Sequence, residues 1–138
     1  MRYLLDTNTC IAYLNRSNQS IYNNLLAHSP EEVCICDVVK YELYFGAYKS
    51  SRTENNLKKL TAFFAEMSSL PFDGKSAELC GKIRAELQAQ GTPIGAYDLQ
   101  IAAITLSHGL TLVTHNTKEF ERIGGLSLAD WQMDETQM

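Results

Sequence analysis

Apolar and polar residues follow two different patterns along this chain. Short runs of consecutive apolar residues predict buried strands at 2–5, 32–36, 69–72, 110–114 and 126–131. Between these runs, apolar residues recur every three or four positions, which predicts helices at 7–15, 18–28, 37–50, 53–67, 74–91, 98–107 and 116–123. Strands that alternate with helices are typical of α/β domains. We therefore expect a short parallel β-sheet of four or five strands, with helices on both faces.

Local signals mark the ends of some of these elements. Asp37 is placed to cap the helix that starts there, and Gly91 is placed to end the helix before it. Pro93 and Gly95 predict a loop before 98–107, a segment so apolar that we expect a buried helix. The length of 138 residues suits one domain, which we place at 1–132, followed by a polar tail at 133–138.

Composition and charge indicate the cellular compartment of the protein. The net charge of -4 gives no support for a generally basic surface. There is no apolar run long enough to span a bilayer, and the apolar stretch at the start ends at Asp6, unlike a signal peptide. No C-x-x-C pair occurs among Cys10, Cys34, Cys36 and Cys80, so we expect free thiols in a reducing compartment. We therefore expect a cytoplasmic protein with no membrane association.

Four acidic residues occur near the predicted carboxyl ends of strands. Asp6 directly follows the first strand, and Glu42 lies in the helix after the second. Asp98 begins the apolar helix, and Glu119 lies just beyond the fourth strand. Because the carboxyl ends of parallel strands lie at one edge of a sheet, where binding sites form, we expect these acids to lie close together.

Each acid also has an ordinary structural interpretation. Asp6 and Asp98 are both suited to cap a helix. Glu42 is compatible with a solvated helix face, although apolar residues surround it in the sequence. Glu119 is compatible with a first-turn position that the helix dipole favours. These interpretations stay open for each residue taken alone.

Taken together, the acids point to a divalent cation. Without a cation, clustered carboxylates repel one another and raise one another's pKa. Mg²⁺ binds one or two carboxylates directly and keeps several waters, which leaves the other acids to hold those waters. Such a site suits the attack of water on a phosphodiester. Asp98 would then lie on a rigid helix because a metal ligand must be fixed in place.

Four stretches of the sequence carry a family resemblance that covers essentially the whole chain. They are "YLLDTN" at the start, "YELYFG" at 41–46, "IGAYDLQIAA" at 94–103 and "LVTHNTKEFERIGGL" at 112–126. In this order and at these intervals they resemble the PIN-domain family. "RAELQAQGTPIGAYD" and "FERIGGLSLADW" are similar to one group of VapC toxins from bacterial VapBC type II toxin–antitoxin modules.

The resemblance implies a Mg²⁺-dependent endoribonuclease, with Mn²⁺ as a substitute ion. It implies catalytic roles for Asp6, Glu42 and Asp98, with Asp6 and Asp98 as metal ligands, and we add Glu119 as a fourth candidate catalytic residue. It also implies cleavage of structured RNA, notably initiator tRNA in its anticodon stem-loop. The implied partners are a VapB antitoxin, whose C-terminal segment lies in a groove and blocks the active site, and a second copy of the chain.

One position departs from the family pattern. Many PIN domains have a fourth acid, an Asp, just after the fourth strand, where this chain has Asn116. Glu119, three residues on, is our candidate for that role through a water molecule. Asn116 is the candidate for orienting substrate or a ligand. Thr7, Asn8 and Thr114 are candidates for supporting the acids.

Basic and aromatic residues supply candidate RNA contacts. The candidates for contacts to phosphates are Lys49, Arg52, Lys58, Lys59, Lys82 and Arg84. An ordinary solvated surface explains the same charges. Tyr41, Tyr44, Phe45 and Tyr48 suit stacking on bases, or else the core or a protein interface. The alternative function is a catalytically silent PIN-like module that acts only by binding a protein partner.

Overall fold

All five predicted strands lie in one sheet, and every neighbouring pair is parallel. The computed structural model describes residues 1–132, so the predicted tail at 133–138 lies outside the described residues. The strand order is β3-β2-β1-β4-β5. The strands are β1 (Tyr3–Leu5), β2 (Val33–Cys36), β3 (Ser68–Leu70), β4 (Thr111–Val113) and β5 (Ser127–Ala129).

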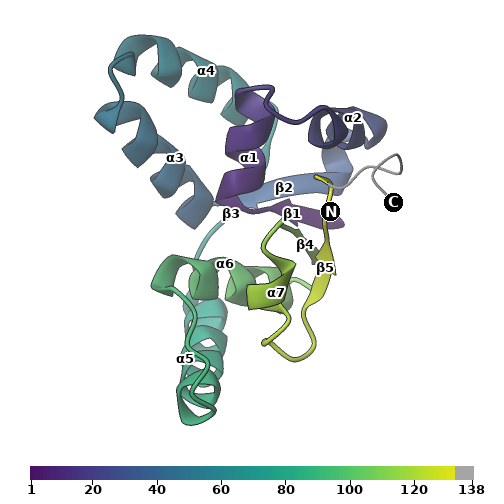
Figure 1. The fold of residues 1–138 in the computed structure, drawn as a ribbon, viewed down its shortest axis with the longest axis vertical. Helices are drawn as coiled ribbons and strands as arrows, with labels where there is room; N and C mark the ends of the chain where they lie inside the picture. The colour runs from purple at the N-terminus through teal and green to yellow at the C-terminus, as the bar shows by residue number, and fades with distance from the viewer. Residues whose placement is uncertain (133–138) are drawn as a thin grey trace.

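Helices cover both faces of the sheet (Figure 1). One layer contains the first four helices and the other contains the last three. They are α1 (Thr7–Leu14), α2 (Gln19–Ala27), α3 (Asp37–Lys49), α4 (Thr53–Ala65), α5 (Gly74–Ala89), α6 (Ala96–Ser107) and α7 (Thr117–Phe120). The predicted α/β architecture is therefore confirmed. No helix in the described part of the chain is long and apolar enough to cross a membrane.

The strand order sets the position of any site. From β1 the chain adds β2 and β3 on one side, and it then returns to add β4 and β5 on the other side. The order therefore reverses next to β1, and a crevice forms at such a switch point beyond the carboxyl ends of the strands. Asp6 is the first residue after β1, so it lies at this point.

The core explains why 98–107 is so apolar. Residues 101–105 of α6 are all buried, and β2 is buried along its whole length. The aliphatic residues Leu4, Ile35, Ile101 and Leu112 are at most 1 % exposed. At about 25 cal/mol per Å² of buried apolar surface, such side chains supply most of the drive for folding. The prediction of a buried helix is confirmed.

Several predicted helix ends were wrong by a few residues. Asp37 is the first residue of α3, and Cys36 is the cap. Asp98 is the third residue of α6, whose cap is Gly95, so the capping interpretation of Asp98 is wrong. Gly91 does follow the end of α5, with a φ of +73° that glycine adopts at little cost. A short 3₁₀ helix, η1 (Pro30–Glu32), was not predicted.

Candidate active site

Asp6 is the most buried of the predicted acids. Its side chain caps α1, because Oδ1 accepts a hydrogen bond from the Thr9 backbone N–H at 2.9 Å. The Thr114 hydroxyl also hydrogen-bonds to this carboxylate. Burial raises the pKa of Asp6 despite these hydrogen bonds. The predicted capping role is confirmed, and it leaves a carboxylate in surroundings that disfavour its negative charge.

Glu42 is held in place by α1. The Thr7 hydroxyl donates a hydrogen bond of 2.6 Å to Glu42 Oε1, and this bond joins α1 to α3. Glu42 is partly buried, so it is not a freely solvated helix residue. Oε1 is occupied by Thr7, which leaves Oε2 to accept a hydrogen bond from water or substrate.

Asp98 shows that the four predicted acids share one electrostatic environment. Its pKa is raised to about 6, first by burial and then by the charges of Glu119, Asp6 and Glu42. Charges raise the pKa of a carboxyl group in this way when they lie near it in a partly desolvated site. Asp6 at the end of β1 and acids from α3, α6 and α7 therefore come together at one edge of the sheet, as the sequence predicted.

Three consecutive residues after β4 each contact a different acid. Thr114 is completely buried and bonds to Asp6. His115 Nδ1 lies 2.9 Å from Asp130 Oδ2. The Asn116 side-chain amide donates to Glu119 Oε2. The end of β4 therefore positions the site, which agrees with supporting roles for Thr114 and Asn116. Asn8, the other candidate, is exposed on the first turn of α1.

Asp130 and Tyr97 were missed in the sequence. The charge of Asp130 helps to raise the pKa of Asp6, so Asp130 borders the site. Asp130 directly follows β5, and that position was the signal that selected Asp6. Tyr97 precedes Asp98 and hydrogen-bonds to Tyr41. That hydrogen bond chiefly raises the pKa of Tyr97, and the charge of Glu42 adds to the effect.

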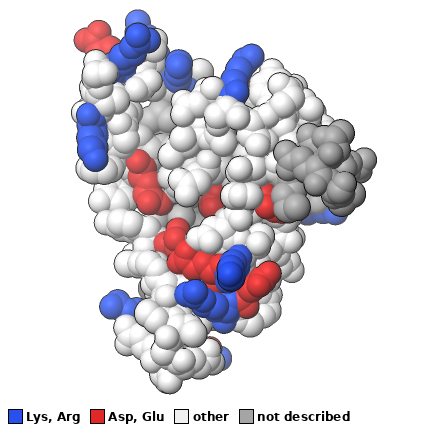
Figure 2. All heavy atoms as spheres, in the orientation of Figure 1, with Lys and Arg blue, Asp and Glu red and all other residues white. Residues whose placement is uncertain are grey.

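The six predicted phosphate contacts fall into two separate groups. Figure 2 shows acidic side chains across the middle of one face, with Lys and Arg above and below them. Lys49, Arg52, Lys58 and Lys59 lie at the end of α3 and on α4, and all four are exposed. Lys82 and Arg84 lie on α5 in the other helical layer. The six candidates therefore form two basic clusters, one in each helical layer.

The donor set fits a metal that keeps its waters. Within residues 1–132, no three His, Cys, Asp or Glu side chains are close enough to enclose an ion by themselves. Mg²⁺ does not need such an enclosure, because it binds through one or two carboxylates and retains water. Asp6 and Asp98 would supply two hard oxygen ligands, and both have raised pKa values that a cation would oppose. Glu42 and Glu119 would then remain for the metal's waters.

The PIN domain family model matches residues 3–126 of this sequence. The chain belongs to the PIN domain family. PIN-domain nucleases generally depend on a divalent metal. The family match runs from the start of β1 to the residue before β5, so it includes Asp6, Glu42, Asp98 and Glu119 of this PIN domain.

Close relatives place this PIN domain among VapC proteins. The tRNA(fMet)-specific endonuclease VapC of Shigella flexneri is 40% identical over 95% of this chain and 98% of its own length. DNA-bound VapBC from Salmonella typhimurium has a TM-score of 0.90, with 39% identity over 95% of this chain and 98% of that chain. VapBC2 from Rickettsia felis, bound to a promoter DNA fragment, has a TM-score of 0.88, with 38% identity over 95% and 99%.

Proposed function

We propose that this PIN domain is a metal-dependent endoribonuclease and the toxin of a VapBC-type toxin–antitoxin pair. The observation that carries the proposal is the set of acids, one buried and three partly buried, at the switch point of the sheet. Asp6 and Asp98 are held there with raised pKa values, which costs stability when both are ionised. A module that only binds a protein partner would gain nothing from acids that lower its stability in this way. The alternative of a silent module is therefore disfavoured.

The chain's own residues divide the chemistry between them. Asp6 and Asp98 would hold Mg²⁺, for which Mn²⁺ is the expected substitute. When bound, the ion supplies charge for the phosphate oxygens and lowers the pKa of an attacking water. Glu42, which accepts a hydrogen bond from Thr7, would orient water through Oε2. Glu119, which accepts a hydrogen bond from Asn116, would orient a second water or accept its proton.

For the substrate we propose structured RNA, and specifically the anticodon stem-loop of initiator tRNA. The support is that the Shigella flexneri relative, which is similar along nearly the whole chain, is a tRNA(fMet)-specific endonuclease. The exposed cations on both sides of the acids offer contacts for phosphates, which position RNA without reading its sequence. A cytoplasmic location, expected from the sequence, agrees with such a substrate.

For the partner we propose a VapB-type antitoxin. The support is that the similar solved structures are VapBC complexes. This chain also has a groove of about 910 Å³ between α1, α2 and α4. Its lining is mainly apolar and includes Tyr13, Leu25, Leu26, Phe63 and Met67. A peptide segment with apolar side chains would bury them there. A homodimer stays our expectation for the toxin itself.

The test is RNA cleavage by purified protein free of antitoxin. Total tRNA and an initiator-tRNA transcript are incubated with protein in Mg²⁺, in Mn²⁺ or in EDTA. We expect metal-dependent cutting at one position, and its loss in Asp98→Asn. Glu54→Gln is the matched control, because it removes one negative charge at the exposed start of α4. Equal cutting by wild type and Asp98→Asn, or by wild type in EDTA, would reject this proposal.

A further inference from the structure

Two tyrosines lie beside the acids without serving the core. Tyr41 immediately precedes Glu42 on α3, and Tyr97 immediately precedes Asp98 on α6. Their rings meet edge to face, with centroids 5.4 Å apart and an interplanar angle of 64°. Their hydroxyl oxygens are 3.2 Å apart. Yet Tyr41 is 52% exposed and Tyr97 is 44% exposed. The pair is therefore fixed in place and open to solvent.

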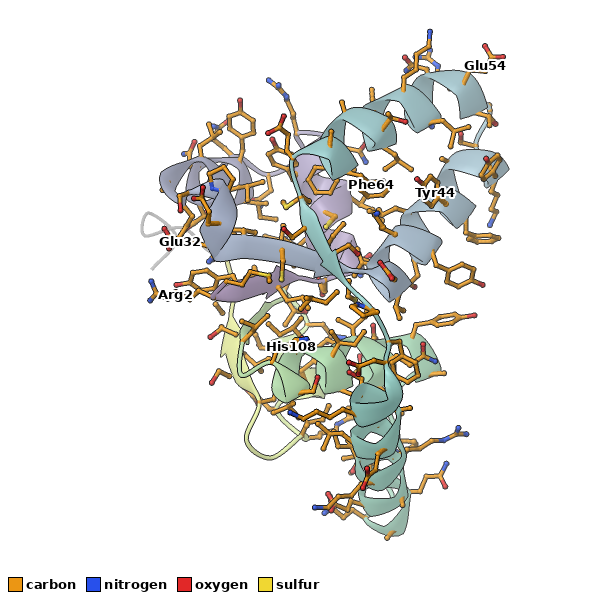
Figure 3. All side chains as sticks on the ribbon, turned by 180° about the vertical axis from the view of Figure 1, so that it is seen from behind. Arg2, Glu32, Tyr44, Glu54, Phe64 and His108 are labelled. Carbon is orange, nitrogen blue, oxygen red and sulfur yellow. The ribbon has the colours of Figure 1, made fainter. Side chains whose placement is uncertain are left out.

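Two other aromatic residues of α3, Tyr44 and Tyr48, have different surroundings. Tyr44 packs against Phe64 of α4, with ring centroids 5.2 Å apart, and Figure 3 shows the two side chains between α3 and α4. Tyr44 therefore belongs mainly to the packing of that helix pair. Tyr48 is 65% exposed, but it lies seven residues after Tyr41, about 10 Å farther along the helix at 1.5 Å per residue. Of these aromatic side chains, only Tyr41 adjoins an acid in sequence and also contacts Tyr97.

We propose that Tyr41 and Tyr97 form a stacking platform for an unpaired base of the RNA, next to the phosphate that is cleaved beside the acids. This inference rests on the proposed function. Aromatic rings bind bases of any identity through their faces, and proteins recognise RNA loops mainly through such unstacked bases. The edge-to-face contact, secured by the two hydroxyls, leaves a ring face open and holds it at a defined angle.

The platform explains a preference for loops that the acids cannot supply. Carboxylates and a metal act on a phosphodiester, which is the same in a helix and in a loop. A base that must leave its stack to lie on Tyr41 or Tyr97 is available in a loop and costly to extract from a duplex. The two tyrosines are therefore specificity-determining residues for single-stranded segments. They contribute binding energy only where the base beside the cut is unpaired.

The experiment removes the ring and the base separately and then together. The substrates are a short RNA hairpin with the initiator-tRNA anticodon loop and a set of hairpins that each lack one loop base. The variants are Tyr41→Leu and Tyr97→Leu, with Tyr48→Leu as the matched control on α3. Tyr97→Phe tests the hydroxyl contact alone. The readouts are kcat, KM and the sedimentation of each protein.

We expect Tyr41→Leu and Tyr97→Leu to lower kcat/KM about tenfold to a hundredfold, mainly through KM, as the loss of one stacked base does. Tyr48→Leu should stay near wild type. On one abasic hairpin the wild type should fall to the level of the variants, and Tyr97→Leu should cause no further loss. Such non-additivity identifies a ring and a base that act as a unit.

Other outcomes overturn the platform. Equal losses on every hairpin would show that Tyr97 does not bind a base. A smaller sedimenting species for both Tyr41→Leu and Tyr48→Leu would show that this face contacts another copy of the chain. Because RNA cleavage itself can fail, binding is measured separately with 2-aminopurine at each loop position. Quenching that depends on Tyr97 supports the platform even without cleavage, and its absence with normal binding overturns it.

Discussion

Asp98 destabilises the folded chain when it is ionised and no cation is bound. In an unfolded chain an aspartate ionises near pH 4, whereas in the fold the pKa of Asp98 is about 6. The folded state therefore binds this proton more tightly than the unfolded state. It follows that the free energy of unfolding falls as the pH rises from about 4 to about 6.

This pH dependence predicts the stability of Asp98→Asn in the absence of divalent metal. At pH 7.5 the variant should be more stable than wild type by about 1–2 kcal/mol, less than the full shift because the carboxyl is only partly buried. At pH 4 the difference should vanish, because wild-type Asp98 is then largely protonated. Thermal and urea unfolding in EDTA at both pH values measure it. A variant less stable than wild type at pH 7.5 would indicate a structural role instead.

At the scale of the element, strands and helices were predictable in existence and type. The apolar runs are buried strands, and the segment 98–107 is apolar because α6 is buried. The exact ends of strands and helices were less predictable, because neighbouring residues compete to end or cap each element. The strand predicted to 72 ends at Leu70, since Pro71 cannot donate a backbone hydrogen bond to a neighbouring strand. Gly95 caps α6 two residues after Pro93, and Asp98 is left inside the first turn.

Site residues were predictable where a rule about sequence position applied. They were not predictable where a contact between two elements determines the position of a side chain. The rule that acids follow strand ends found Asp6 and Glu119, and it applies equally to Asp130, which was overlooked. The hydrogen bond between Thr7 and Glu42 joins residues 35 positions apart, and no local pattern encodes it. The pairing of Tyr41 with Tyr97 spans 56 positions and depends on how α3 packs against α6.

The two basic clusters predict which helical layer contacts RNA. If RNA lies along α4, the double substitution Lys58→Ala and Lys59→Ala should raise KM about tenfold and leave kcat unchanged. It should also lower the salt dependence of binding, since fewer counterions are released. Lys82→Ala with Arg84→Ala on α5 is the matched test of the opposite layer, with the same loss of two exposed charges.

Fluorescence anisotropy of a labelled hairpin at several salt concentrations measures the RNA affinity of both double variants. If only one double variant binds more weakly, the RNA contacts the helical layer of that variant. Equal losses would mean that RNA crosses the acids and contacts both layers. No loss for either pair would support the ordinary interpretation of these cations as a solvated surface.

At the scale of the whole molecule, the site joins the sheet to both helical layers. Asp6 follows β1, Glu42 comes from α3 in one layer, and Asp98 comes from α6 in the other (Figure 1). An ion held by Asp6 and Asp98 would therefore link the end of β1 to α6. It also offsets repulsion in a chain whose net charge is already -4.

We accordingly expect Mn²⁺ or Mg²⁺ to stabilise the entire domain. At ten times its dissociation constant an ion that binds only the folded state adds about 1.4 kcal/mol, or about 4 °C in Tm for a chain of this size. The gain should be present at pH 7.5 and disappear below about pH 6, because Asp98 must lose its proton to bind metal. Asp98→Asn should lose the gain, whereas Glu54→Gln should keep it. If both variants gained equally, the ion would be screening the net charge, and the carboxylates at the switch point would not be its ligands.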